Sequence, residues 1–314
     1  MIQSFKYITC LLLCFLVSAI SFAEEIEVNG IKYEVIKKAK VAILLDAYNC
    51  KSSDVNIPSS VTYEGVECEV TKIQGSAFTT CEQIESFYFP NSIKEVWGDA
   101  FKLKYNNANS VHISDMNAWL NIDFRNESAN PLYRADNFLL NENIVTEVSI
   151  PSGFTKVNQY VFINCKSLKK VNIPNTVTEI GSGAFYGCIS LKEATLPKSV
   201  RRIKSDAFRS CEALESVTIP NLVTEIEWCS FWGCKSLKKV VIPRSVKVIE
   251  SGAFAGCEEL TDVYCYSTII PNTDLSAFEN SQVEYATLHV PANLIIQYKS
   301  KFPWKRFGKI VPIK

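Results

Sequence analysis

The chain has 314 residues, 47% of them hydrophobic, and its 33 Lys and Arg residues balance 33 Asp and Glu residues, so it carries no formal net charge. A nucleic-acid-binding protein needs a basic footprint, so this balance argues against nucleic acid as a partner. Beyond the N-terminal segment no apolar stretch approaches the length of a membrane span. We therefore expect no transmembrane segment in the mature chain.

Residues 1–23 have the three parts of a secretory signal peptide. One lysine precedes the apolar run ITCLLLCFLVSAI, and Ser21-Phe22-Ala23 then offers a small-residue cleavage site before Glu24. We expect cleavage after Ala23, and hence a secreted or cell-surface protein. An uncleaved membrane anchor is the alternative, because the uncharged run from Tyr7 to Ala23 lies at the lower edge of the length of a span.

Residues 24–76 predict an N-terminal β cap that leads into a first turn. Asn29-Gly30 stands between alternating segments, which is a strong signal for a two-residue hairpin, and residues 61–68 have a similar pattern around Glu64-Gly65. The open end of a stack of strands exposes its core and its edges, so a cap is expected there.

A repeat with a period of about 23 residues dominates residues 77–286. It is clearest in three residue types of five consecutive units. These are the prolines at 151, 174, 197, 220 and 243, the phenylalanines at 162, 185, 208, 231 and 254, and the cysteines at 165, 188, 211, 234 and 257. A fixed period in this range is typical of a solenoid, whose units bury their apolar faces against one another.

The units share the skeleton I-P-x-x-V-x-x-I-x-x-x-A-F-x-x-C-x-x-L-x-x-V. The V-x-I-P step alternates apolar and polar residues and predicts a short strand that ends at the proline. In the A-F-x-x-C-x-x-L step apolar residues recur at spacings of three, which predicts one helical turn or a 3₁₀ segment. Burial of the apolar side chains of one unit contributes about 10–20 kcal/mol. Ordering the residues of that unit costs about 35 kcal/mol, so a single unit cannot fold alone.

The five repeated cysteines, here called the ladder cysteines, are interpreted as reduced, small, buried hydrophobes. Side chains at equivalent positions of neighbouring turns are about 8–10 Å apart, and a disulfide needs Cβ atoms within about 4.5 Å. Cys229 and Cys265 depart from the pattern and are the better candidates for pairing or reactivity.

The Ile-Pro strand end and the Ala-Phe-x-x-Cys turn resemble the BspA-like class of leucine-rich repeats of bacterial secreted and surface proteins. The regular units span about residues 148–263, and related units occur at Ala77-Phe78, Ala100-Phe101 and Ala277-Phe278. The resemblance implies an α/β repeat, a leucine-rich-repeat solenoid of short parallel strands with helical or 3₁₀ turns. It specifies a scaffold rather than an activity.

Two segments depart from the period. Pro90 and Pro151 lie farther apart than two units require, so residues 102–147 carry an insertion, with a capped short helix near 114–120 and a polar loop after it. Two interpretations of this insertion remain open, a loop that serves binding and an enlarged structural turn. Residues 287–314 predict a C-terminal cap with a helix over about 292–301, or alternatively a sorting signal.

No phosphate-binding loop, zinc-spaced pair, nucleophile elbow or metalloprotease motif occurs. Gly181-Ser182-Gly183 is interpreted as a turn, because other units carry other residues there. A Cys–His pair built on His112 is conceivable, but both histidines lie at ordinary strand positions. We therefore expect no enzymatic activity and no cofactor.

The middle residue of each V-x-I-P strand points outward, which predicts a column of surface residues. The column is Tyr88, Ser149, Asn172, Thr195, Thr218, Val241 and Tyr264. It lacks Lys and Glu, whereas the neighbouring column (Ser86, Glu147, Lys170, Glu193, Ser216, Lys239 and Asp262) is mostly charged. A charge-poor centre with a polar rim is typical of an interface. Tyr186, Arg209 and Trp232 share another offset and predict a second, aromatic patch.

The favoured hypothesis is an exported, adhesin-like protein that binds a protein or glycan at a cell surface or in the extracellular matrix through this strand face. The alternative is a structural or spacer element of the cell envelope without a specific ligand. A redox-responsive module that uses the off-pattern cysteines is a third possibility.

Overall fold

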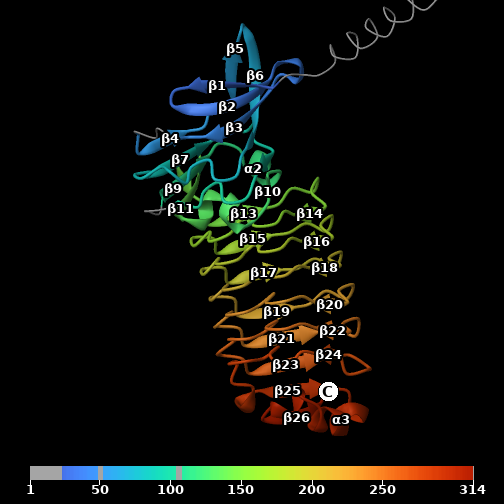
Figure 1. Cartoon of the computed structure of the whole chain (residues 1–314). Helices are drawn as coiled ribbons and strands as arrows, with labels where there is room; N and C mark the ends of the chain where they lie inside the picture. Colours follow the sequence, from blue (N-terminus) through green and yellow to red (C-terminus); the bar gives the residue numbers. More distant parts are fainter. Residues whose placement is uncertain (1–22, 49–51, 104–107, 314) are drawn as a thin grey trace, which may run out of the picture.

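Each repeat contributes two short parallel strands, and stacking turns these strands into two ladders along an elongated molecule (Figure 1). The structure, a computed structural model, describes residues 23–48, 52–103 and 108–313. The expected signal peptide lies outside the described residues, apart from Ala23.

The first ladder, here called the strand face, is formed by the predicted V-x-I-P strands and by equivalents outside the regular units. Its strands are β4 (Asp54–Asn56), β7 (Ser86–Phe89), β9 (Ala108–Ile113), β11 (Ala135–Leu140), β13 (Glu147–Ser149), β15 (Lys170–Asn172), β17 (Glu193–Thr195), β19 (Ser216–Thr218), β21 (Lys239–Ile242), β23 (Asp262–Cys265), β25 (Thr287–Val290) and β26 (Lys309–Pro312). Neighbours pair in parallel, except between β11 and β13 and between β17 and β19, so equivalent residues of paired repeats lie side by side.

The second ladder was not predicted from the sequence. Its strands are β6 (Val66–Ile73), β8 (Glu95–Val96), β10 (Asp123–Phe124), β14 (Lys156–Val157), β16 (Glu179–Ile180), β18 (Arg202–Ile203), β20 (Glu225–Ile226), β22 (Val248–Ile249) and β24 (Asn272–Thr273). Most are only one dipeptide long with a single inward side chain, such as Ile180 or Ile226. A strand this short cannot produce the alternating pattern by which strands are recognised in a sequence.

The phenylalanine of each repeat occupies one core column, as the fixed spacing of these residues implies. Phe162, Phe185, Phe208, Phe231, Phe254 and Phe278 stack with ring centroids 5.2–5.6 Å apart and interplanar angles of 2–14°. All six are fully buried. The centroid separation is close to the spacing between neighbouring strands, so the ladder sets the stack.

The A-F-x-x-C step is not a continuous 3₁₀ helix but a series of linked turns. The N–H of Tyr186 donates to the Gly183 carbonyl, and that of Cys188 to the Phe185 carbonyl, both at 3.1 Å. Left-handed residues two positions before and after the phenylalanine, Gly183 (φ 57°) and Gly187 (φ 72°), interrupt the helix. A Cβ on Gly183 would lie 2.5 Å from the Tyr160 ring of the preceding repeat, so glycine also makes room for stacking.

The N-terminal region begins with the two predicted hairpins. β1 (Glu24–Val28) pairs antiparallel with β2 (Ile31–Ile36), and β5 (Ser60–Tyr63) pairs with β6. The turn residues Asn29 and Gly30 both have positive φ, as this type of turn requires. A short 3₁₀ helix, η1 (Lys37–Ala39), then leads to β3 (Val41–Asp46), which joins the hairpins to the second ladder.

Residues 102–147 contain the capped helix that the sequence predicts, α2 (Met116–Leu120), whose N-cap Asp115 accepts from the Asn117 N–H at 2.8 Å. Two 3₁₀ helices, η2 (Glu127–Ala129) and η3 (Pro131–Tyr133), follow, and β12 (Asn143–Ile144) folds back on β11. The buried Trp119 donates to the Val161 carbonyl at 2.9 Å. These contacts favour a structural role.

The C-terminal segment forms a cap on the end of the stack. It contains the 3₁₀ helices η4 (Val283–Tyr285), η5 (Ala292–Leu294) and η6 (Trp304–Arg306) and one α-helix, α3 (Ile295–Ser300). Trp304 and Phe307 contact the ring of Phe278, with centroids 5.3 and 5.4 Å away. The last ring of the phenylalanine column is thus covered.

The ladder cysteines are free and buried, as predicted, and they also donate hydrogen bonds. The thiols of Cys188, Cys211 and Cys234 reach the carbonyls of Phe162, Phe185 and Phe208 at 3.1–3.2 Å. At the end of the stack Ser281 takes over this role, donating to the Phe254 carbonyl at 2.6 Å. A small buried donor is therefore what this position requires.

Cys229 and Cys265, the better candidates for pairing or reactivity by sequence, are both free, so neither is paired. Both are buried, and burial raises the pKa of each thiol, which also argues against reactivity. Cys265 lies 3.3 Å from the Tyr298 hydroxyl. Cys81, which the sequence did not single out for pairing, is disulfide-bonded.

Candidate binding surface

The seven residues of the predicted column all lie on the strand face, at equivalent positions of β7, β13, β15, β17, β19, β21 and β23. Register pairing places Ser149 beside Asn172 and Asn172 beside Thr195. A second run places Thr218 beside Val241 and Val241 beside Tyr264. All seven are exposed or half-buried, and the apolar neighbours on the same strands, such as Val171 and Val240, point into the core.

Strand pairing within this column is interrupted at two places in the described part of the chain. β11 is paired on its outer side with β12 rather than with β13, so Tyr88 belongs to a different sheet from Ser149. The second break lies between β17 and β19, where a hollow of about 230 Å³ is lined by Thr195 and Thr218 among others. At this break the inward residue of β17 is Ala194, where neighbouring repeats have the larger valine.

Both ends of the column carry a tyrosine stacked on a histidine, a feature that sequence reasoning missed. His112 lies beside Tyr88, with ring centroids 4.3 Å apart, and His289 lies beside Tyr264 at 4.1 Å. The signal was present, since each histidine follows its tyrosine at close to the repeat spacing. One or two extra positions in these units hid the equivalence from an alignment on the regular period.

Each histidine is held by a carboxylate at the rim. His289 Nε2 is 2.8 Å from Asp262 Oδ1, and Lys239 Nζ lies 5.0 Å from the centre of the Tyr264 ring. At the other end His112 Nδ1 is 3.0 Å from Glu142. Each end is thus a fixed aromatic platform with charged groups beside it.

The middle of the column is polar and uncharged. The Asn172 side-chain amide donates to Ser149 Oγ at 3.1 Å, and Thr195 and Thr218 are exposed. Val241 is half-buried between the threonine and tyrosine of neighbouring strands. In the adjacent column the charges alternate, because Lys170 lies between Glu147 and Glu193.

The predicted aromatic patch exists on the turn side of the molecule and is built around Arg209. The guanidinium carbon lies 5.3 Å from the Tyr186 ring centre and 4.7 Å from that of Trp232, and Asp206 binds the guanidinium at 3.1 Å. Trp228, which the sequence analysis did not include, is 5.9 Å away. Arg209 is therefore a packed residue and not a freely exposed one.

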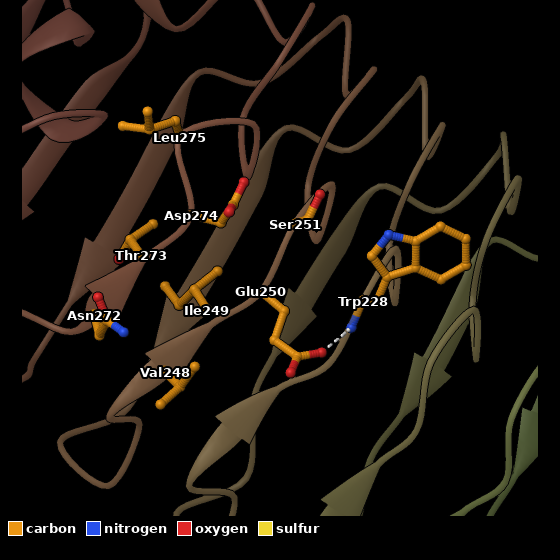
Figure 2. Close-up of a pocket in the computed structure, with 9 residues that line it drawn as sticks. All are labelled: Trp228, Val248, Ile249, Glu250, Ser251, Asn272, Thr273, Asp274 and Leu275. Atoms are coloured by element: carbon orange, nitrogen blue, oxygen red, sulfur yellow. Dashed lines mark hydrogen bonds between the residues drawn. The ribbon is translucent and has the colours of Figure 1, made fainter.

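A groove of about 540 Å³ lies beside this patch and is lined by β22, β24 and the residues that follow each strand (Figure 2). Figure 2 shows the Trp228 indole at one side of the groove, and the Glu250 carboxylate accepts from the Trp228 backbone N–H at 2.7 Å. Asp274 and Leu275 lie toward the other side. This groove is the principal alternative to the strand face.

Within the described residues no group of three or more His, Cys, Asp or Glu side chains could hold a metal ion. None of the helices described is long and apolar enough to cross a membrane.

The comparison with protein families gives one assignment. A family described as "BspA type Leucine rich repeat region" matches the chain in six copies, over residues 47–123, 135–261 and 178–303. The chain therefore belongs to the BspA-type leucine-rich-repeat family. No curated protein sequence matches it.

Solved structures of bacterial leucine-rich-repeat proteins are similar in fold. A leucine-rich repeat protein from Bacteroides ovatus ATCC 8483 has 20% identity and a TM-score of 0.56, covering 92% of this chain and 76% of that one. A leucine rich cell surface protein from Faecalibacterium prausnitzii A2-165 has 21% identity and a TM-score of 0.33, covering 86% and 94%. The pneumococcal vaccine antigen PcpA has 13% identity and a TM-score of 0.46, covering 94% and 100%. Only the first of these three exceeds a TM-score of 0.5, and it supports the solenoid fold alone.

Proposed function

We propose that this chain is an exported, adhesin-like protein that binds a protein or glycan partner through its strand face. The observation that carries the proposal is the uncharged column from Tyr88 to Tyr264, which lies beside a mostly charged column and has a tyrosine–histidine stack at each end. Aromatic residues with a charge-poor centre and a polar rim are typical of binding surfaces. Solenoids also use their extended faces to engage partners. Membership of the BspA-type family and the signal-peptide pattern support export and surface display.

A direct test starts from the mature chain, residues 24–314, applied to panels of extracellular-matrix proteins and glycans. For a ligand found there, Thr195→Lys, Thr218→Lys and Val241→Lys together place three charges in the uncharged column. We expect affinity to fall at least tenfold, because each introduced lysine would lose its water at the interface without an opposite charge on the partner to pair with it. The matched control is Asn175→Lys, Asn221→Lys and Thr224→Lys, which adds equal charge at exposed positions between the two ladders.

Loss of binding in the strand-face triple variant alone supports the proposal. Equal loss in both triple variants refutes a specific strand-face site. A ligand that is lost on Trp228→Ala but retained by the strand-face variant moves the site to the groove of Figure 2. Absence of any ligand across the panels favours the structural or spacer role.

A further inference from the structure

The C-terminal cap carries a cluster of unpaired positive charge. Residues 285–313 contain five cations, Lys299, Lys301, Lys305, Arg306 and Lys309, and neither Asp nor Glu. All five side chains are exposed, and none forms an ion pair with another described residue. In the solenoid body charges alternate across the strands instead, as in the Arg202–Glu179 pair at 2.5 Å. The cap is thus set apart electrostatically from the stack that it covers.

Exposed apolar side chains lie among these cations. Ile296 is 84% exposed and Phe302 is 51% exposed. Leu294 and Tyr298 are buried against the stack, so the helical period turns Ile296 and Lys299 outward on α3. The Lys305 ammonium lies 3.8 Å from the Phe302 ring centre, and the Lys305 N–H donates to the Lys301 carbonyl at 2.9 Å. Cationic and apolar groups therefore share one surface.

This surface closes the far end of the solenoid, where α3 and β26 lie beyond β25 (Figure 1). A partner that covers the end of the stack leaves the long strand face open. The cap and the strand face are therefore separate surfaces, and a role for the cap does not depend on the function proposed for the strand face.

We propose that the C-terminal cap docks on an anionic lipid surface. Each Lys or Arg near such a surface adds electrostatic attraction, which decays within a Debye length. Isoleucine and phenylalanine beside the lysines insert into the boundary between headgroups and acyl chains, as in interfacial helices. An anionic polysaccharide would pair with the charges but would leave Ile296 and Phe302 in water. The combination of both kinds of side chain favours lipid.

The test is sedimentation of the mature chain with sucrose-loaded vesicles of phosphatidylcholine alone, or of phosphatidylcholine and phosphatidylglycerol at about 3:1. We expect binding to the anionic vesicles only, with weakening at high salt. Lys305→Glu with Arg306→Glu should reduce the partition coefficient at least tenfold. The control Lys169→Glu with Lys198→Glu has the same net charge, alters exposed residues of the solenoid body and should change binding less than twofold. Circular dichroism confirms that each variant is folded.

A second pair of changes tests the apolar component. Ile296→Asn with Phe302→Ser should weaken vesicle binding several-fold while its salt dependence stays unchanged, because no charge is altered. The proposal is wrong if wild-type protein ignores anionic vesicles, or if the cap and control charge variants bind equally. It is also wrong if soluble heparin removes the protein from vesicles and the Ile296/Phe302 variant binds like wild type, since the surface is then a site for an anionic polymer. A concentration-dependent dimer that the cap variants abolish would assign the surface to a second copy of the chain.

Discussion

The N-terminal region, residues 23–147, and the regular stack, residues 148–263, bury the same kinds of side chain by different means. In the stack one ring repeats above the next, nearly parallel. In the N-terminal region the rings of Phe78, Phe87 and Phe101 include edge-on contacts at 73° and 87°. Trp119 likewise packs edge-on against Phe89, at 79°. Identical spacing allows identical contacts, whereas an irregular spacing requires contacts of its own.

Polar contacts differ in the same way. In the stack the same buried donor, the ladder thiol, recurs in successive repeats. The N-terminal region meets the stack through individual side chains. The buried Asn130 amide donates to the Tyr160 carbonyl at 2.8 Å and accepts from the Leu132 N–H at 2.9 Å, and Asn158 reaches the Leu120 carbonyl at 3.0 Å. Damage to the stack is therefore expected to spread along a column, and damage to the N-terminal region to stay local.

The largest expected effect comes from interrupting the phenylalanine column. Phe208→Ala removes a fully buried ring between two stacked neighbours and should reduce the free energy of unfolding by about 3–5 kcal/mol. Urea denaturation followed by circular dichroism measures the loss. Lys192→Ala, at an exposed position without an ion pair in the described structure, should cost about 0.5 kcal/mol or less.

Comparable losses in these two variants would show that the column does not stabilise the stack. Arg209, next to Phe208 in sequence, is unsuitable as the surface control. Its guanidinium is held by Asp206 and lies over aromatic rings, so its removal is expected to cost about 1–2 kcal/mol.

A smaller, pH-dependent effect is expected in the N-terminal region, where Glu95 on β8 binds Lys72 on β6 and Arg125, the residue after β10. Burial raises the pKa of Glu95, but the bonds from Arg125 and Lys72 outweigh it and lower the pKa to about 2. Because folding lowers the pKa of Glu95, its carboxylate stabilises the fold at pH values above the ordinary pKa of a glutamate. This contribution is lost as the pH falls toward 2.

Glu95→Gln should therefore cost about 1–2 kcal/mol at pH 7 and little at pH 2, as measured by urea denaturation at both values. Glu193→Gln, at an exposed site in the stack without an ion pair in the described structure, should have a small effect at both. A loss for Glu95→Gln that is equal at the two pH values would contradict the assignment.

What the sequence predicted depended on equal spacing. The phenylalanine column, the ladder cysteines and the outward column were visible because their residues recur at one fixed spacing, and the Asn-Gly hairpin has a local signal. The second ladder has strands too short to produce a pattern. The stacking of His289 on Tyr264 was missed because their spacing is slightly longer than the repeat. The linked turns were missed because some of their left-handed residues, such as Asp206 and Cys229, are not glycines. The Cys265–Tyr298 contact joins the stack to the cap and has no repeat at all.

The smallest expected effect is a difference in thiol reactivity between the cysteines of the two regions. Burial raises the pKa of Cys188 and Cys211 well above the ordinary thiol value and that of Cys234 to about 12, so these residues are protonated and shielded. Alkylation of the folded mature chain without reductant should leave all three unmodified. Denaturation without reductant should expose them fully, whereas Cys81, which is disulfide-bonded, should react only after reduction.

Peptide mass spectrometry reads each site separately, so the four cysteines are compared in one experiment. Reductant should leave the unfolding of the regular stack unchanged, because its cysteines contribute packing and a hydrogen bond to a carbonyl rather than a covalent link. If Cys188, Cys211 or Cys234 reacts only after reduction, the ladder is cross-linked. The stack would then share the covalent support of the N-terminal region, and the contrast between repeated and unique contacts would not hold for its cysteines.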